Sequence, residues 1–277
     1  MQLEELKKFS SEINSKFLFD FDLKKSNWFN IGGKTKAYFK PDNLSDLILF
    51  LKKFGLKEKI YILGAGSNTL ISDKTYEGVV IKLGKNFANI SMLPNSTIIA
   101  GSACSDKKLS DFAMENEVGG FEFLACIPGT VGGGLRMNAG CFNKEFKDIL
   151  LSVQAIDRNG RVLTIPAKKI MFEYRNNDLP EDLIFLSASF KGFNKDKEKI
   201  KNEIIDLKDK KVWQLIKESV PQDLNFGDAS ISEKHFNFFV NKGNASFNDM
   251  IKLINFVQEQ VKKKTGIILE KEIKILE

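Results

Sequence analysis

The sequence contains one histidine, few cysteines and no long apolar run. His235 is the only histidine among 277 residues, so a multi-histidine metal centre is not expected, and a serine–histidine–aspartate triad would have to include it. Cys104, Cys126 and Cys141 lie far apart in the sequence and show no CxxC spacing. We therefore expect three buried or half-buried thiols rather than a zinc site or a disulfide framework, and we predict no metal. No apolar run is long enough to span a membrane.

The charge pattern also lacks the marks of a nucleic-acid-binding protein. Lysine and arginine number 42 against 36 acidic residues, a net charge of +6, but the basic residues are mostly lysines spread among acidic ones. Without an arginine-rich stripe and interleaved aromatics, no nucleic-acid partner is predicted. A bound anion, such as a nucleotide or a pyrophosphate, fits this charge equally well. The amino terminus lacks the basic-then-apolar order of a signal peptide, so we predict a cytoplasmic protein without a membrane partner.

Length and patterning predict several α+β lobes. A chain of 277 residues with 43% apolar and 28% charged residues is long enough for a large core and more than one domain. Strand-like and helix-like patterns are mixed along the chain, and from about Phe193 the sequence becomes charged and helical. This change predicts two or three lobes of the α+β class.

Local signals place several elements. Asn43 precedes an apolar-periodic run that stops at Gly55, and Ser105 precedes another that stops at residues 119–120, so both runs predict capped helices. The pair Asn159-Gly160 predicts the turn of a hairpin. Residues 27–41 alternate like a strand pair around Gly32 and Gly33. The remaining expected elements are a helix over residues 1–15, strands within 59–63, 78–83, 96–103 and 183–192, charged helical sequence over 194–220, a strand, a turn and a long helix within 235–266, and a final strand within 267–276.

A first glycine-rich loop follows the apolar stretch at residues 59–63. It consists of Gly64, Ala65, Gly66, Ser67 and Asn68. It is not a dinucleotide fingerprint of the G-x-G-x-x-G type, because no helical run follows, and it is not a P-loop, because no Gly-Lys-Ser/Thr follows. Bare backbone amides beside serine and asparagine can form an anion-binding nest, and a plain tight turn fits this loop equally well.

A second glycine-rich loop makes a ligand more plausible than two unrelated turns. Its candidate binding residues are Ile127, Pro128, Gly129, Thr130, Gly132 and Gly133. Both loops are expected to follow apolar strands. Two such loops on one domain suit the two ends of an extended dinucleotide.

Four motifs in order resemble one family. They are ILGAGSNTLISD, GFEFLACIPGTVGGGLRMNAG, FEYR and GIILEKEIKIL, and together they resemble the UDP-N-acetylenolpyruvoylglucosamine reductases from about Trp28 to Leu276. The short EYRNNDLPED stretch is similar to the second type of that family. The resemblance implies a vanillyl-alcohol-oxidase-type FAD-binding fold of two lobes with a third, substrate-binding lobe. The implied boundaries are 1–83 with the carboxy-terminal strand 266–277, then 84–193, then 194–265.

The resemblance also implies chemistry. The family uses non-covalent FAD, with NADPH as co-substrate, to reduce UDP-N-acetylglucosamine enolpyruvate to UDP-N-acetylmuramate in peptidoglycan precursor synthesis. Arg175 matches the family's catalytic arginine and Glu272 its catalytic glutamate, with Glu270 expected on the same strand face as Glu272. Tyr174 is expected either to line the substrate pocket or to be a buried core tyrosine. Asn138 is expected either to bond to the flavin or to cap a turn.

One family motif is absent. The third lobe of the family carries a segment like Gly-Ser-x-Phe-Lys-Asn-Pro, whose serine protonates the substrate carbon, but here the flanking sequences join between Lys211 and Val212. This gap implies an internal deletion and an impaired reductase. Two alternatives stay open, a flavin-binding homologue without turnover and an FAD oxidase of the same broad fold. We interpret His235 as structural or adjacent to the substrate rather than as a base.

Overall fold

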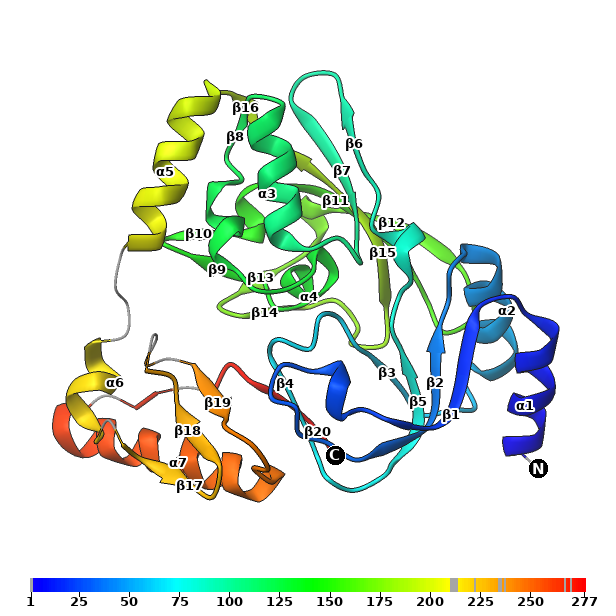
Figure 1. The fold of residues 1–277 in the computed structure, drawn as a ribbon. Coiled ribbons are helices and arrows are strands. Elements are labelled where there is room, and N and C mark those ends of the chain that lie inside the picture. The colour runs from blue at the N-terminus through cyan, green and yellow to red at the C-terminus, as the bar shows by residue number, and fades with distance from the viewer. Residues whose placement is uncertain are drawn as a thin grey trace. The chain divides into compact units, whose positions relative to one another are not determined.

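The computed structural model describes residues 2–209, 214–221, 223–233, 236, 238–266, 268–269 and 271–277. The chain divides into two compact units (Figure 1). Unit 1 comprises Met1–Asp20, Ala37–Ala65 and Glu77–Lys208, and unit 2 comprises Phe21–Lys36, Gly66–Tyr76 and Asp209–Glu277. Helices and strands are mixed in both units, which confirms the predicted α+β class. The division into three lobes drawn from the family resemblance stays a prediction.

The described residues form α-helices and short 3-10 helices in both units. α-Helices in the described residues are α1 (Gln2–Glu12), α2 (Leu44–Phe54), α3 (Asp106–Glu115), α4 (Val131–Arg136), α5 (Lys197–Asp209), α6 (Gln214–Ser219) and α7 (Phe247–Thr265). Short 3-10 helices are η1 (Lys24–Ser26), η2 (Lys85–Phe87), η3 (Glu122–Cys126), η4 (Phe146–Asp148) and η5 (Ala167–Lys169).

A five-stranded antiparallel sheet packs against α4, the helix that begins at the second glycine loop. Its order is β12 (Val162–Pro166), β11 (Leu150–Ile156), β15 (Ile184–Lys191), β7 (Thr97–Gly101) and β6 (Ile90–Leu93). α4 packs on β15 and β7 (Figure 1). Phe146 and Phe190 are fully buried in the apolar core of this region, with Leu135 of α4 and Leu109 of α3. The loop that begins α4 is therefore held by a continuous core.

A second sheet, which lies mostly in unit 1, contains the strand that leads into the first glycine loop. Its order is β1 (Lys16–Asp22), β2 (Lys34–Lys40), β5 (Tyr76–Ile81) and β3 (Ile60–Ile62), and β3 pairs with β5 in parallel. Phe9 of α1, Phe39 of β2, and Phe50 and Phe54 of α2 form its buried aromatic cluster. Small two-stranded pairs complete unit 1: β9 (Gly140–Cys141) with β10 (Lys144–Glu145), β13 (Phe172–Glu173) with β14 (Asn176–Asn177), and β8 (Val118–Gly119) with β16 (Phe193–Asn194).

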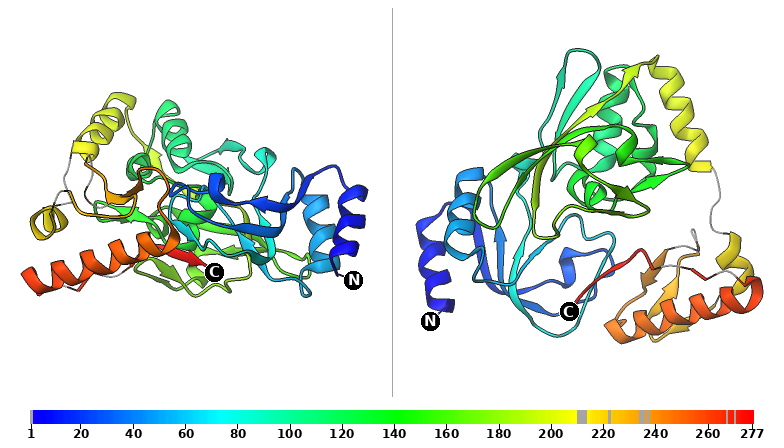
Figure 2. Two further views of the ribbon diagram at one scale, coloured as in Figure 1. Left: turned by 60° about the horizontal axis from the view of Figure 1, so that its bottom comes forward. Right: turned by 180° about the vertical axis from the view of Figure 1, so that it is seen from behind.

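Unit 2 consists of one long helix on a small sheet, with the carboxy-terminal strand. α7 runs along the sheet of β17 (Asn225–Phe226), β18 (Ala229–Ile231) and β19 (Phe239–Asn241) (Figure 2). β20 (Lys274–Leu276) pairs in parallel with β4 (Thr69–Ile71). Leu70 of β4 shares an apolar core with Leu253 and Val257 of α7.

The strongest local predictions are confirmed. Asn43 caps α2 by accepting a hydrogen bond from the Asp46 N–H at 2.8 Å, and Ser105 caps α3 by accepting one from the Lys108 N–H at 3.2 Å. β11 and β12 form the predicted hairpin, and Gly160 in its turn has φ +77°. The long helix expected within 235–266 is α7, which ends at Thr265 and is followed by Gly266 in the left-handed conformation.

Several predicted elements differ. Residues 27–33 form no strand: the Gly33 N–H bonds to Ser72 O, and β2 pairs instead with β1, which the sequence did not suggest. The capped helix at Ser105 ends at Glu115, before the expected glycine stop, because residues 118–119 pair with β16. The charged helical stretch over 194–220 contains two helices, α5 and α6.

Two further differences bear on the predicted site. Residues Glu122–Cys126, before the second loop, form η3 rather than a strand. The final strand spans only Lys274–Leu276, so Glu272 precedes it, and the expectation that Glu270 and Glu272 share a strand face is wrong for Glu272.

Candidate functional site

The first glycine loop leads from β3 to β4 with no helix after it, as predicted. Gly66 has φ +73°, in the left-handed region that glycine occupies without strain. A Cβ placed there would lie 2.5 Å from Ser26 O and 2.7 Å from Asn27 Cα. The Gly66 carbonyl also accepts a hydrogen bond from the Trp28 N–H at 2.9 Å. Only glycine fits this position, because backbone atoms occupy the space that a side chain would need.

The second loop runs from η3 into the first turn of α4, with Thr130 as the helix N-cap residue. The Thr130 side chain makes no capping hydrogen bond. The Val131 N–H donates to Cys104 O and the Gly132 N–H to Ser102 O, both at 2.9 Å. These two amides bind protein carbonyls, so neither is available to donate to a bound ligand. The loop is instead anchored to the segment that follows β7.

Within unit 1, Gly64 at the start of the first loop lies close to Thr130 of the second. A Cβ on Gly64 would lie 2.9 Å from the Thr130 Oγ1, so the Thr130 hydroxyl occupies the side of Gly64 that a side chain would need. A Cβ on Gly132 would lie 3.0 Å from the Ser102 Cβ, whereas one on Gly133 would approach Thr130 Oγ1 only to 3.6 Å. A side chain at Gly64 or Gly132 would therefore force its neighbour to shift, whereas Gly133 has room for a Cβ.

Asn138, one of the predicted flavin contacts, is fully buried and bonds to protein. Its Nδ2 donates to Glu145 Oε2 and to Glu173 O, both at 3.1 Å, and its Oδ1 accepts from the Lys147 N–H at 3.1 Å. These bonds tie the segment after α4 to β10 and β13. In these bonds Asn138 acts as a buried residue that links loops.

Arg175 lies in the two-residue turn between β13 and β14. Its backbone has φ +55°, a left-handed conformation that is uncommon for a residue with a long side chain and that is often found at functional sites. Its Nη2 donates to Gly140 O at 3.0 Å, and its Nη1 lies 3.7 Å from Glu145 Oε1. The guanidinium carbon lies 4.6 Å from the centre of the Tyr174 ring. These contacts fix the position of a cation that is 21% exposed.

Tyr174 is 63% exposed, so it is not the buried core tyrosine that was one of its two expected states. Its ring instead lies beside the Arg175 guanidinium. An exposed aromatic ring that stacks on a cation stabilises the cation through its π face.

Glu145 is a member of this cluster that the sequence did not predict. Its carboxylate contacts Arg175, Lys147 Nζ at 2.6 Å, and the Asn138 amide. In the β9–β10 pair Glu145 is the direct partner of Gly140, so one register position supplies both the carbonyl and the carboxylate that hold Arg175. In the sequence Glu145 belongs to a charged run, which gives no signal of this role.

Asp106 is a second buried acid that the sequence did not predict. It begins α3, and its N–H donates to Gly129 O of the second loop at 3.3 Å. The side chain is fully buried, and in the described part of the chain neither carboxyl oxygen has a hydrogen-bond partner. Desolvation by burial raises the pKa of Asp106 to about 8, so the neutral acid predominates at pH 7.

Glu272 is exposed and is held through its backbone. Its carbonyl accepts a hydrogen bond from Asn68 Nδ2 at 2.8 Å, and the Lys274 N–H donates to Asn68 O at 3.0 Å. Asn68 of the first loop therefore fixes the segment that carries Glu272, although 204 residues separate the two in sequence. His235, Glu270 and the Lys211–Val212 junction lie outside the described residues.

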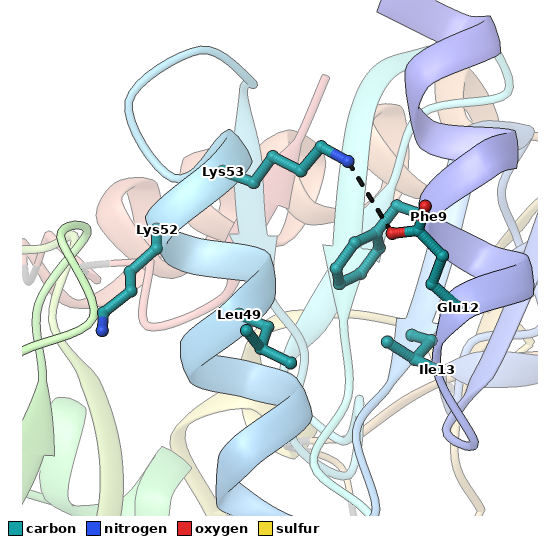
Figure 3. Close-up of a pocket in the computed structure, with 6 residues that line it drawn as sticks. All are labelled: Phe9, Glu12, Ile13, Leu49, Lys52 and Lys53. Carbon is teal, nitrogen blue, oxygen red and sulfur yellow. Dashed lines mark ion pairs between the residues drawn. The ribbon is translucent and has the colours of Figure 1, made fainter.

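A cavity of about 310 Å³ lies elsewhere, between α1 and α2 (Figure 3). It is lined by Phe9, Glu12, Ile13, Leu49, Lys52 and Lys53. Lys53 Nζ lies 4.0 Å from Glu12 Oε2 beside it. None of the predicted site residues lines this cavity. Among the described residues no cluster of three or more His, Cys, Asp or Glu side chains suits a metal ion, and no described helix has the length and apolarity to cross a membrane.

Comparison with known proteins gives consistent results along the whole chain. Residues 35–166 match the family described as FAD binding domain, and residues 166–276 match the UDP-N-acetylenolpyruvoylglucosamine reductase, C-terminal domain. The chain is 69% identical over 301 aligned positions to the UDP-N-acetylenolpyruvoylglucosamine reductase of Pelagibacter ubique, with 100% of both chains covered. It is 43% identical to the enzyme of the same name from Rickettsia bellii, with 92% of each chain covered.

Solved structures show the same fold. The structure is similar to UDP-N-acetylenolpyruvylglucosamine reductase from Thermus caldophilus, with a TM-score of 0.79 and 24% identity over 95% of this chain and 99% of that chain. It is also similar to Physcomitrella patens BBE-like 1, with a TM-score of 0.50 and 15% identity over 68% of this chain and 44% of that chain. At these identities the similarity shows a shared fold.

Proposed function

The chain belongs to the UDP-N-acetylenolpyruvoylglucosamine reductase family, and on that premise we propose which of its residues serve the reaction. It is an FAD-dependent oxidoreductase of peptidoglycan precursor synthesis, with a vanillyl-alcohol-oxidase-type FAD-binding domain and a UDP-sugar substrate. NADPH is the proposed co-substrate. FAD, when bound, supplies the hydride chemistry that connects NADPH to the enolpyruvyl double bond, while the protein supplies binding, orientation and charge.

The two glycine loops are the proposed FAD-binding elements, with the flavin held non-covalently. The residues are Gly64, Ala65, Gly66, Ser67 and Asn68 of the first loop and Ile127, Pro128, Gly129, Thr130, Gly132 and Gly133 of the second. The packing supports this proposal, because side chains are excluded at Gly64 and Gly66 and the loops contact each other at Gly64 and Thr130. Backbone that is bare and fixed suits the close approach of a dinucleotide. We assign Asn138 a supporting role, since its described bonds are to protein.

Arg175 is the proposed cation for the substrate. Addition of hydride to the enolpyruvyl group places negative charge next to a carboxylate, and a fixed guanidinium stabilises such charge. Gly140 O and Glu145 hold Arg175 from one side, and Tyr174 stacks on it, so the group is positioned before the substrate binds. Glu272 is the proposed second catalytic residue, and Asn68 fixes its backbone. Tyr174, being exposed, is proposed to contact the substrate.

The second half-reaction is proposed to be impaired in this chain. The family segment with the proton-donating serine is absent between Lys211 and Val212, outside the described residues. The alignment with the 69% identical relative supports a deletion, because it has 301 positions against 277 residues here, a difference of 24. A cytoplasmic location, and the absence of nucleic-acid and membrane partners, stay predictions from the sequence.

The observation that carries the proposed function is the full-length identity of 69% to the Pelagibacter ubique enzyme. The variant Arg175→Lys tests the proposed role of Arg175. Lysine keeps the charge and loses the bidentate fork. Loss of one charge-assisted hydrogen bond costs about 1.5–3 kcal/mol, so the Kd for the enolpyruvyl UDP-sugar should rise about 10- to 150-fold. Titration of the flavin absorbance with substrate measures this Kd.

Arg161→Lys is the matched control, because Arg161 lies exposed in the β11–β12 hairpin. It should leave both FAD content and substrate Kd unchanged. If Arg175→Lys binds the substrate as tightly as Arg161→Lys does, the assignment of Arg175 is wrong.

A further inference from the structure

Two of the three cysteines meet although they are distant in the sequence. Cys126 is the last residue of η3 and Cys141 lies in β9, so they stand at the two ends of the segment that contains the second glycine loop and α4. The Cys141 thiol donates to Phe123 O, in the same 3-10 helix as Cys126, at 3.2 Å. β9 packs against η3, so the Cys141 side chain lies beside the 3-10 helix that ends at Cys126. Both are half-buried, whereas Cys104 is fully buried.

We propose that Cys126 and Cys141 are a redox-sensitive pair that closes a reversible intramolecular disulfide across the base of the second glycine loop when the protein meets hydrogen peroxide. Disulfides of this kind in cytosolic proteins are usually transient and redox-sensing. The geometry that favours the pair is the contact between Cys141 and the 3-10 helix that ends at Cys126, together with the partial exposure of both residues. Cys104 is excluded as the partner of either by its burial and by its own bond to Ser105 O at 3.3 Å.

The chemistry has two balanced steps. The Cys126 thiolate attacks peroxide, the O–O bond breaks, and with one proton a sulfenic acid on Cys126 and one water are formed. The Cys141 sulfur then attacks the Cys126 sulfur, the S–O bond breaks, and the thiol proton leaves with the hydroxyl group as a second water. Burial raises the pKa of Cys141 to about 12, so near neutral pH it stays a thiol and the first attack is assigned to Cys126.

The pair is adjacent to the residues that hold Arg175. Cys141 follows Gly140, whose carbonyl accepts the hydrogen bond from Arg175 Nη2. The Arg175 guanidinium is near enough to Cys141 to favour the charged form of that thiol, which opposes part of the effect of burial. Drawing Cys141 toward Cys126 displaces this carbonyl, so the disulfide should weaken substrate binding. This consequence rests on the proposed role of Arg175, whereas disulfide formation does not.

The experiment counts thiols in the FAD-loaded protein. The reduced protein is treated with hydrogen peroxide, denatured, alkylated and examined by intact mass and by a non-reduced peptide map. Alkylated cysteines should fall from the three of the sequence to one, with a peptide linking Cys126 to Cys141, and a dithiol reductant should restore all three. Cys104→Ser should still form the link, while Cys126→Ser and Cys141→Ser should not.

Other outcomes overturn the proposal. These are three alkylated thiols after peroxide, a link that involves Cys104, a link between two chains, or over-oxidation of one cysteine without a link. The wild-type measurement is decisive even if a variant folds poorly. Substrate Kd is measured on the oxidised wild type and on peroxide-treated Cys126→Ser. A linked wild type with unchanged Kd would refute the effect on Arg175 and leave the disulfide established.

Discussion

Gly66→Ala and Gly266→Ala form a matched pair that separates backbone strain from close packing. Both glycines have nearly the same left-handed conformation, with φ +73° and φ +74°. A Cβ on Gly266, at the end of α7, would meet nothing within 4 Å, whereas one on Gly66 would lie 2.5 Å from Ser26 O. Both variants therefore introduce backbone strain, and only Gly66→Ala also introduces a steric clash.

The magnitudes follow from these surroundings. Placing alanine in the left-handed region costs roughly 1–2 kcal/mol, which is the whole effect expected for Gly266→Ala. At Gly66 the new methyl group also displaces backbone atoms of Ser26 and Asn27, and overpacking of this kind adds about 1–3 kcal/mol. Gly66→Ala should therefore reduce the free energy of unfolding by roughly 2–5 kcal/mol, about 1–3 kcal/mol more than its control.

Equilibrium unfolding in urea, followed by circular dichroism with and without saturating FAD, measures both free energies. FAD affinity is measured on the same samples, and Gly66→Ala should lower it while Gly266→Ala leaves it unchanged. Equal losses of unfolding free energy in the two variants would refute the reasoning, because the close approach of Ser26 and Asn27 would then have no energetic consequence. Unchanged FAD affinity in Gly66→Ala would contradict the place of the first loop in the cofactor site.

Two further perturbations test buried groups beneath the second loop. Burial raises the pKa of Asp106 to about 8 from an unfolded value near 3.9, so the contribution of the neutral acid to stability is complete below about pH 4 and is lost as pH rises to about 8. Asp106→Asn should therefore make the free energy of unfolding depend less on pH over this range. An unchanged pH dependence in the variant would contradict the raised pKa of Asp106. Gly134→Ala places a Cβ 2.2 Å from the Phe146 ring and should destabilise by about 1–3 kcal/mol, whereas Gly133→Ala, with its nearest neighbour at 3.6 Å, should not destabilise, and thermal unfolding of the two compares them.

Sequence patterns predicted the elements whose causes are local. Asn43 and Ser105 cap helices because each side chain bonds to a backbone N–H three residues away, and Gly160 supplies the left-handed conformation of a two-strand turn. These rules act within a few residues, so a single sequence contains them. The fold class and the loop from Gly64 to Asn68 followed from the same kind of signal.

Elements and contacts with distant causes were not predictable in this way. β1 is a strand because it pairs with β2, and residues 122–126 form η3 rather than a strand although their sequence is apolar. Glu145 reaches Arg175 because β9 and β10 pair in one register, and Asn68 meets Glu272 across 204 residues. The family resemblance supplied Arg175 and Glu272, but it supplied none of the groups that hold them.

Under the proposed function, this chain retains what is needed to accept hydride from NADPH and lacks the proton-donating segment of substrate reduction. Anaerobic stopped-flow absorbance of the flavin tests the two halves separately, with the 69% identical relative prepared in parallel. NADPH should reduce the flavin of both proteins at similar rates. Because a positioned general acid contributes about 10²- to 10⁴-fold, the enolpyruvyl UDP-sugar should then reoxidise the flavin of this chain at least about 100-fold more slowly than that of the relative. Reoxidation at the relative's rate would contradict the proposed impairment, since another residue would then supply the proton.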